Sequence, residues 1–514
     1  MMQNGSARRS CGGRFGRLVV MVIAVTVMAA GPAPGQGWVT VDEFTSVTSR
    51  ANGIGLGAGD RLVAFGRNRD ASGVLHSLVR RSDDLGANWT TVADESETLS
   101  LEAAGKDGAG NLYAVGSTSP GGHWIVRKSA DNGATWVTVD DYQLQAGSLA
   151  AAHCFATDSS GTTLFVGGQA AYSIKTSVLY HLIVRRSTNS GGTWQTVMDY
   201  TYPTPKKGWS ASGAAAYGIV SLPGAIVVAG GAAESKGTQS FNHWIVRKSA
   251  DNGSAWITVD DFTFNGGASP NGGIARDASG NLYAAGVGLA ADGYYYWLVR
   301  KSALGATWST VDQFTYSPTR VSQPAAVSSS PSGEVFISGS GNDGSSDHWI
   351  TRRSADQGAS WSTADDFQVS PGESSQVKGV VSDSAGNVYA AGYGFDGAVL
   401  HWVVRKLSGV PVGAGVLGRT ETLFRRGDSS RDGAVDLTDA YHSLGWLFLG
   451  GPALPCPDAA DANDDGVLGI ADAIHTLNFL FLGGETLPYP GSAACGLDPT
   501  ADDLGPCEVD PTNC

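Results

Sequence analysis

The chain has 514 residues and a net charge of −14 at pH 7, with 71 glycines and only 16% charged residues. This length allows a large core and more than one domain. Abundant glycine with few charges suits an all-β protein with many tight turns. Nucleic acid is excluded as a partner, because phosphate binding needs a basic surface that this acidic chain lacks.

Residues 1–36 have the features of a secretory signal peptide. Arginines precede the apolar run Leu18–Ala30, which is short for a bilayer span, and small residues follow it. No later stretch reaches membrane-spanning length. We therefore expect an exported protein, either secreted or located in the periplasm or at the cell surface, with no membrane span.

The stretch His123–Asp141 is the repeating unit of the chain. Two runs of β-branched and aromatic residues flank a polar turn that contains Gly133, a pattern that predicts a β-hairpin. Self-similarity at a long period indicates a repeat architecture. Further copies lie at His76–Asp94, His181–Asp199, His243–Asp261, Trp297–Asp312 and His348–Asp366.

A Val/Thr-Arg-Arg/Lys marker counts seven units. The spacings between the marker arginines are 47, 58, 62, 53, 52 and 53 residues, a length that suits one four-stranded propeller blade. The markers are Val79–Arg81, Val126–Lys128, Val184–Arg186, Val246–Lys248, Val299–Lys301, Thr351–Arg353 and Val404–Lys406. Second strands are expected at Leu62–Gly66, Leu112–Gly116, Leu164–Gly167, Ile226–Gly230, Asn281–Gly286, Val335–Gly339 and Val388–Gly392.

The last unit lacks its fourth strand, and the missing strand stands at the other end of the chain. Gly37–Phe44 resembles Thr135–Tyr142. We therefore predict that Trp38–Phe44 pairs with Trp402–Lys406 and closes a ring of seven blades, which removes an exposed sheet edge.

The polar turn carries Ser-x-Asp-x-Gly-x-Thr/Ser-Trp in full at Ser129–Trp136 and Ser354–Trp361, and nearly so at Ser82–Trp89 and Ser249–Trp256. Serine and aspartate side chains can cap backbone N–H groups in such a turn. The pattern resembles the Asp-box (BNR repeat) of sialidase-type propellers. This resemblance implies a seven-bladed β-propeller in which the box is a structural turn away from the binding face.

Reactive residues in a pseudo-symmetric ring should differ from blade to blade, whereas the marker Arg, Lys and Asp residues recur. We interpret these as structural cross-strand pairs and strand ends. The Arg-Ile-Pro element of sialidases is absent and Glu is scarce, so no catalytic residue can be named. Cleavage of β-glucans by two Asp residues, as in other Asp-box propellers, stays open.

The loops that vary in length join the second strand to the third, and the fourth strand to the next blade. Variable loops on a rigid scaffold commonly carry recognition, so we expect this face to bind a glycan or protein; ordinary loop packing is the alternative. The candidate ligand-binding residues are Trp209, Tyr294, Tyr295, Tyr316, Arg320 and Phe395.

The tail, residues 418–514, holds four Arg against sixteen Asp and Glu, a net charge of −12. Two loops, 33 residues apart, place oxygen donors in the EF-hand pattern with Gly at the sixth position. They predict two calcium sites, against the alternative of solvated acidic turns. The candidate ligands are Asp428, Ser430, Asp432, Ala434 (backbone), Asp436 and Asp439, and Asp461, Asn463, Asp465, Val467 (backbone) and Asp472.

Each loop leads into a predicted helix, Ala440–Leu449 or Ala473–Leu482. The duplicated loop and helix resemble dockerin type I modules, with Asp in place of Glu at loop position 12. The resemblance implies docking to a cohesin-like partner. The apolar helices could equally pack on each other or hold the module to its own propeller.

Cys456, Cys495, Cys507 and Cys514 suggest two disulfides in an exported tail, and three connectivities are possible. We favour Cys456–Cys495 with Cys507–Cys514. Cys154, in a predicted innermost strand, is expected to be buried and free.

The sequence therefore predicts an all-β protein followed by a small α-helical calcium-loop module. The expected parts are a signal peptide (1–36), a seven-bladed Asp-box propeller (37–407), a linker (408–420) and a dockerin-like module (421–514). Two functions remain open: a monomeric recognition or scaffold protein, which we favour, and a glycoside hydrolase of a polysaccharide-degrading system. If the chain is an enzyme, we expect a hydrolase of O-glycosyl bonds.

Overall fold

A computed structural model of the chain describes residues 37–96, 99–118, 122–158, 160–174, 177–204, 208–408, 424–484, 486–488, 490–492, 495–496, 504 and 507. The predicted signal peptide and all but the first residue of the predicted linker lie outside these residues. No helix among them is long and apolar enough to cross a membrane.

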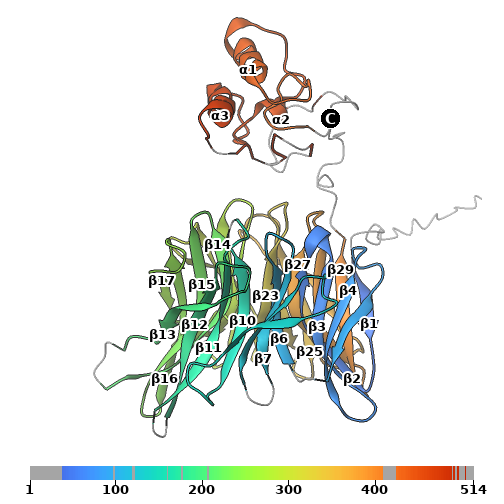
Figure 1. Ribbon diagram of the computed structural model, residues 1–514, viewed down its shortest axis with the longest axis vertical. Coiled ribbons are helices and arrows are strands. Elements are labelled where there is room, and N and C mark those ends of the chain that lie inside the picture. The colour runs from blue at the N-terminus through green and yellow to red at the C-terminus, as the bar shows by residue number, and fades with distance from the viewer. Residues whose placement is uncertain are drawn as a thin grey trace, which may run out of the picture. The chain divides into compact units, whose positions relative to one another are not determined.

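In the described part of the chain, seven antiparallel sheets form a seven-bladed β-propeller (Figure 1). The innermost strands contact one another in a closed ring, which places the propeller axis beside them. They are β2 (Thr48–Leu56), β6 (Leu99–Lys106), β10 (Ala150–Thr157), β14 (Ser210–Leu222), β18 (Ala268–Ser269) with β19 (Ile274–Arg276), β23 (Ser322–Ser329) and β27 (Ser375–Ser382).

Three further strands follow outward in each blade, and the predicted second strands and markers lie within them. The second strands are β3 (Leu62–Arg69), β7 (Leu112–Thr118), β11 (Leu164–Ile174), β15 (Ala225–Lys236), β20 (Asn281–Leu289), β24 (Val335–Asn342) and β28 (Val388–Phe395). The third are β4 (Leu75–Ser82), β8 (Trp124–Ser129), β12 (Ser177–Ser187), β16 (Gln239–Ser249), β21 (Tyr295–Ala303), β25 (Asp347–Ser354) and β29 (Leu400–Leu407). The outermost are β5 (Thr90–Glu95), β9 (Val137–Tyr142), β13 (Gln195–Tyr200), β17 (Ile257–Phe262), β22 (Ser309–Phe314), β26 (Ser362–Phe367) and β1 (Trp38–Phe44).

The predicted circular closure is confirmed. Strand β1 pairs with β29 in antiparallel register, from Trp38 opposite Leu407 to Phe44 opposite Trp402. The first strand of the chain thus completes the sheet β27–β28–β29–β1. The core lies between neighbouring sheets, where a tryptophan on the third strand presses on a glycine of the next blade. A Cβ on Gly392 would come within 2.8 Å of the Trp349 ring.

The marker arginines have a structural role, as predicted, but they join neighbouring blades and not strands of one blade. Arg80 of β4, for example, makes a bidentate pair with Asp42 of β1 at 2.6 and 2.7 Å. Both side chains are about nine-tenths buried or more. The same pair recurs as Arg185–Asp140, Arg300–Asp260, Arg352–Asp312 and Arg405–Asp365.

The polar turns after the third strands are tied by side-chain hydrogen bonds. In the turn Ser129–Trp136, the Ser129 hydroxyl accepts a bond from the Gly133 N–H at 2.8 Å, and Asp131 accepts from the Thr135 N–H at 2.8 Å. These bonds lower the pKa of Asp131 to about 2, the Thr135 hydroxyl and N–H contributing before Ser129. The turn is therefore held by its own polar groups.

In its described residues, the C-terminal module contains three helices, α1 (Leu437–Leu449), α2 (Pro457–Ala460) and α3 (Ile470–Phe481). Helices α1 and α3 begin three residues before the predicted starts, because Asp439 and Asp472 cap their first turns. The short helix α2 was not predicted. Helices α1 and α3 pack against each other.

The favoured disulfide pairing is wrong. Cys456 is bonded to Cys507, across 51 residues, and both side chains are buried beside Phe424. Sequence spacing alone could not choose among the three connectivities, because the choice depends on how the module folds back on itself. Cys495 is also disulfide-bonded, and Cys514 lies outside the described residues. Cys154 is buried and free, as predicted.

Candidate ligand-binding site at the propeller axis

A β-bulge at one equivalent position turns a side chain of each innermost strand toward the axis. In β2 the ladder to β3 shifts between Ala51 and Gly53, so that Asn52 is the extra residue. Bulges are known to re-aim side chains beside functional sites. The equivalent residues are Glu102, His153, Tyr217, Ala325 and Lys378, and in the fifth blade Asn271 occupies the break between β18 and β19.

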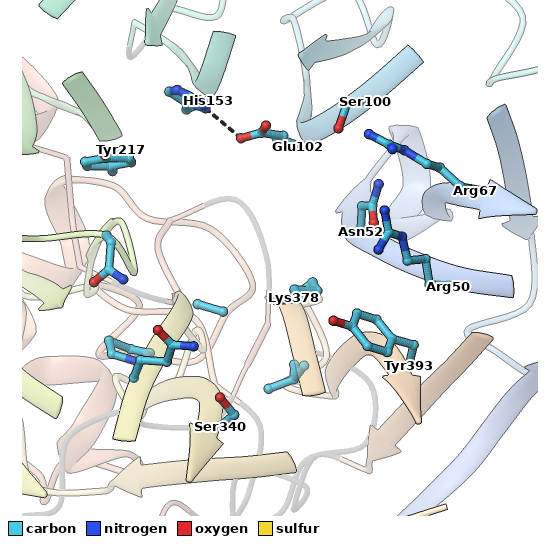
Figure 2. Close-up of a pocket in the computed structure, with 15 residues that line it drawn as sticks. Arg50, Asn52, Arg67, Ser100, Glu102, His153, Tyr217, Ser340, Lys378 and Tyr393 are labelled. Atoms are coloured by element: carbon cyan, nitrogen blue, oxygen red, sulfur yellow. Dashed lines mark hydrogen bonds and ion pairs between the residues drawn. The ribbon is translucent and has the colours of Figure 1, made fainter. Parts of the chain in front are cut away.

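These seven residues, which we call the bulge ring, line one cavity of about 420 Å³ (Figure 2). The seven blades contribute six different residue types at this position, asparagine occurring twice, although the rest of the blade repeats. This variation meets the condition set for a functional site in a pseudo-symmetric ring. The cavity also reaches Arg50, Arg67, Ser100, Gln323, Pro324, Ser340, Val377 and Tyr393.

Two arginines lie directly opposite each other at one side of the cavity. Arg50 of β2 is the cross-strand partner of Arg67 of β3. Like charges in this position destabilise a sheet. Burial and then the charge of Arg50 lower the pKa of Arg67. Among the described residues the Nε atom of Arg67 is buried with no hydrogen-bond partner.

The equivalent cross-strand positions in other blades carry no such charge. They are occupied by Ser100 with Ser117, Gln323 with Ser340, and Gln376 with Tyr393. The arginine pair is therefore a departure from the blade pattern.

A third cation, Lys378, comes from the bulge of β27. Its ammonium donates to Gln376 at 2.9 Å and lies 5.6 Å from the centre of the Tyr393 ring. Burial and then the charge of Arg50 lower the pKa of Lys378. Lys378 and Arg50 thus add to one positive region of the cavity.

Glu102, His153 and Tyr217 occupy three successive blades on the other side of the cavity (Figure 2). The Nδ1 atom of His153 lies 2.6 Å from a Glu102 carboxylate oxygen. The Nε2 atom is buried and has no hydrogen-bond partner among the described residues. The rings of His153 and Tyr217 stack with their centres 5.6 Å apart. Burial and then the charge of Glu102 raise the pKa of Tyr217, so its phenol stays protonated.

The cavity is therefore cationic in a chain whose net charge is negative. Arg50, Arg67 and Lys378 face a single lining carboxylate, Glu102, which is engaged with His153. Amide groups of Asn52, Asn271 and Gln323 complete the polar lining. Such a lining can bind an anion together with neutral hydroxyl groups.

None of the six loop residues singled out from the sequence lines this cavity. Trp209 contacts Phe241, with the ring centres 5.3 Å apart, and the Tyr316 hydroxyl donates to Asp366 at 2.8 Å. Arg320 donates to the carbonyl of Thr319. Tyr294, Tyr295 and Phe395 lie at or beside the ends of β21 and β28. Their role in ligand binding stays a prediction.

Sequence reasoning missed the bulge ring, although the sequence holds a signal for it. When the first strands of the units are aligned, one column reads Asn, Glu, His, Tyr, Ala and Lys between columns of small residues. This variable column is the one that faces the axis.

The two C-terminal acidic loops share one pattern of hydrogen bonds. Asp428 accepts from the N–H of Asp432 and Gly433, and Asp461 accepts from Asp465 and Gly466 at the same offsets. The last aspartate of each loop accepts from the N–H of the third residue, Ser430 or Asn463.

Each loop buries two carboxylates, Asp428 with Asp439 and Asp461 with Asp472. Burial, opposed by backbone hydrogen bonds but reinforced by the neighbouring charge, raises the pKa of Asp472 to about 6. In the described residues no three or more His, Cys, Asp or Glu side chains are gathered as a ready metal cluster. The predicted backbone ligands Ala434 and Val467 directly follow the loop glycines.

No family model matches the chain, and no curated protein matches it. Some solved structures are similar to this chain at low identity. A polysaccharide lyase described as an ulvan lyase is 10% identical with a TM-score of 0.48, over 72% of this chain and 96% of that one. An α-L-arabinofuranosidase from Fusarium graminearum is 14% identical with a TM-score of 0.39, over 61% and 96%. An α-L-arabinanase from Penicillium chrysogenum is 13% identical with a TM-score of 0.38, over 61% and 93%. Likeness at this level concerns the fold alone.

Proposed function

We propose that the propeller binds an anionic glycan in its axial cavity. The observation that carries the proposal is the Arg50–Arg67 pair, two like charges placed directly opposite each other on neighbouring strands. An arrangement that costs stability and points into a cavity is typical of a functional site. The guanidinium forks suit a carboxylate or sulfate group. The amides and the Tyr393 ring suit the hydroxyls and apolar face of a sugar.

The test is calorimetric titration of the full chain with polygalacturonate, glucuronan or a sulfated galactan, each beside a neutral polymer of the same backbone. We expect binding of an acidic polymer that weakens with salt, and about tenfold or greater loss in the Arg67→Gln variant. Equal binding of the charged and neutral polymers would refute the proposal.

A glycoside hydrolase is the second candidate, since glycan-active propellers share this fold. Hydrolysis in the usual way needs two carboxyl groups about 5–9 Å apart. The cavity lining contributes one, Glu102. This observation favours binding over two-carboxylate hydrolysis. Release of saturated reducing sugars by the wild-type chain, lost in Glu102→Gln, would instead support the hydrolase.

For the tail we propose two calcium sites, built from the paired buried carboxylates of each acidic loop. Burial and then the neighbouring charge of Asp461 raise the pKa of Asp472, and a divalent cation would stabilise both carboxylates in their charged form. Asp428→Ala and Asp461→Ala should each remove about one calcium from a calorimetric titration, with Asp502→Ala as a control outside both loops. A flat wild-type titration would refute the sites.

We further propose that the chain is exported and that its tail, like the dockerins it resembles, docks to a cohesin-like protein. The acidic loops and the exposed apolar residues of α1 and α3, such as Tyr441 and Phe481, support docking. N-terminal sequencing of the exported protein should find residues 1–36 removed. A pull-down with a cohesin domain should depend on calcium; capture that is unchanged by a chelator would contradict this role.

A further inference from the structure

We infer that the axial cavity is an active site that cleaves uronate-containing glycans by elimination. This inference rests on the proposed function and deepens it, because it names both the substrate class and the reaction. Three features of the cavity carry it: the arginine pair, the histidine held by a glutamate, and the protonated tyrosine beside that histidine.

The arginine pair can bind the carboxylate of a uronate residue. The proton on C5 of a uronate is weakly acidic because the neighbouring carboxylate is already negative. Two guanidinium groups on that carboxylate stabilise the further charge that develops when the C5 proton leaves. Arg50 and Arg67 can meet it together because they are cross-strand neighbours, and Lys378 adds a third positive charge to the same cavity.

His153 is oriented to act as the base. The Glu102 carboxylate lies 2.6 Å from Nδ1, which places the imidazole proton there and leaves the Nε2 lone pair available. Nε2 is the atom that is buried without a hydrogen-bond partner in the described part of the chain. A base held by a third group in this way is a recurring catalytic arrangement. Glu102 is therefore a positioning residue, and His153 is the catalytic base.

Tyr217 is placed to act as the acid. Its ring stacks on His153 with the centres 5.6 Å apart, which is close enough for the two residues to serve adjacent atoms of one sugar. Burial keeps the phenol protonated at neutral pH. It can therefore donate its proton to the glycosidic oxygen that leaves C4.

The step balances without a further reactant. His153 removes the C5 proton, the C5–H electron pair forms the C4–C5 double bond, and the C4–O bond breaks. The leaving oxygen takes the proton of Tyr217. The products are a new non-reducing end with an unsaturated uronate and a free hydroxyl on the other fragment. Transfer of the proton from His153 through solvent to Tyr217 restores the site.

The experiment incubates the full chain with polygalacturonate, glucuronan and alginate, and follows the ultraviolet absorbance of the unsaturated product together with its mass. Binding of each polymer is measured in parallel. We expect unsaturated oligosaccharides from at least one polymer. His153→Ala and Tyr217→Phe should each lower kcat by about 100-fold or more while polymer binding is retained. Glu102→Gln should lower kcat by about tenfold with little change in KM.

His123→Ala is the matched control. His123 lies 2.7 Å from Asp141 in the same type of histidine–carboxylate pair, but does not line the cavity. Its removal should leave the activity unchanged. Retained polymer binding shows that each variant is folded.

The outcomes separate the two proposals. Binding without any product would overturn the elimination and leave the proposed function standing. Absence of binding to every acidic polymer would overturn the proposed function itself. Saturated products would show hydrolysis and also overturn the elimination.

Discussion

Two sets of arginines in this propeller follow opposite rules. Between blades, an arginine such as Arg80 meets a buried aspartate of the neighbouring blade in a bidentate pair. At the axis, Arg50 and Arg67 meet each other. Most arginines of the first set are paired with a carboxylate of the neighbouring blade, while those of the second set leave a positive cavity open to a ligand. The difference separates residues that hold the ring together from residues that serve a ligand.

Two of the seven blades lack the aspartate that pairs with the arginine of the neighbouring blade. Ala93 and Met198 stand where the other blades have aspartate. Arg127 pairs with Glu95 instead. Arg247 lies over the Tyr200 ring, 4.3 Å from its centre, and donates to the Trp256 carbonyl at 2.8 Å. At both blades that lack the aspartate, the neighbouring arginine therefore still contacts another group where the blades meet.

The largest effect is expected from breaking a pair at the closing strand. Asp42→Ala leaves Arg80 buried without its carboxylate and should lower the free energy of unfolding by about 3–5 kcal/mol. Denaturant unfolding measures the loss. The double variant Asp42→Leu with Arg80→Met should recover most of it. If the free energy of unfolding of the single variant falls by well below 1 kcal/mol, the arginine–aspartate pairs between blades do not stabilise the propeller.

A smaller effect is expected from the polar turns. Asp131→Ala removes the bonds that Asp131 accepts from Ser129 and Thr135 in an exposed turn. The melting temperature should fall less than in Asp42→Ala, and ligand binding at the axis should not change. Asp84→Ala, in the equivalent turn of the first blade, is the parallel variant. A change in ligand binding in either variant would contradict the purely structural role of these turns.

The smallest expected effect is a pH dependence of the stability where β1 pairs with β29. His401 of β29 lies 2.7 Å from Glu43 of β1 and 2.8 Å from Asp396. Burial alone would lower the pKa of His401, but hydrogen bonds to the two carboxylates and their charges raise it above 6.5. The stabilisation should be complete below that value and disappear as the pH rises through the raised pKa. Thermal unfolding of the wild type and His401→Gln across this window should converge at high pH; parallel curves would exclude this contribution.

The repeats made the propeller predictable from the sequence. The repeated segments predict the strand positions and the number of blades. The absence of a fourth strand from the last unit predicts the closure by Trp38–Phe44. The partner of each marker arginine was not predictable, because the pairing crosses from one blade to the next. The same holds for Cys456 and Cys507, which only the fold of the module brings together.

The site was harder to predict for a related physical reason. Attention to repeated motifs and long loops selects residues such as Tyr316 and Arg320, which bond within the loop face. The bulge ring lies in short strands of mostly small residues, where a single column differs between blades. A bulge changes which way a side chain points without a clear mark in the sequence. Only the register shifts of the ladders place His153 and Tyr217 in one cavity.

Measuring both the stability and the polysaccharide binding of Arg50→Gln tests most directly whether the axial arginines serve a ligand and not the propeller frame. Removing one of two opposed like charges should leave the free energy of unfolding unchanged or raise it by up to about 1 kcal/mol. The same variant should bind an acidic polysaccharide about tenfold more weakly or worse. A variant that is destabilised yet binds as tightly as the wild type would contradict the account, because Arg50 would then belong to the frame of the propeller and not to a ligand site.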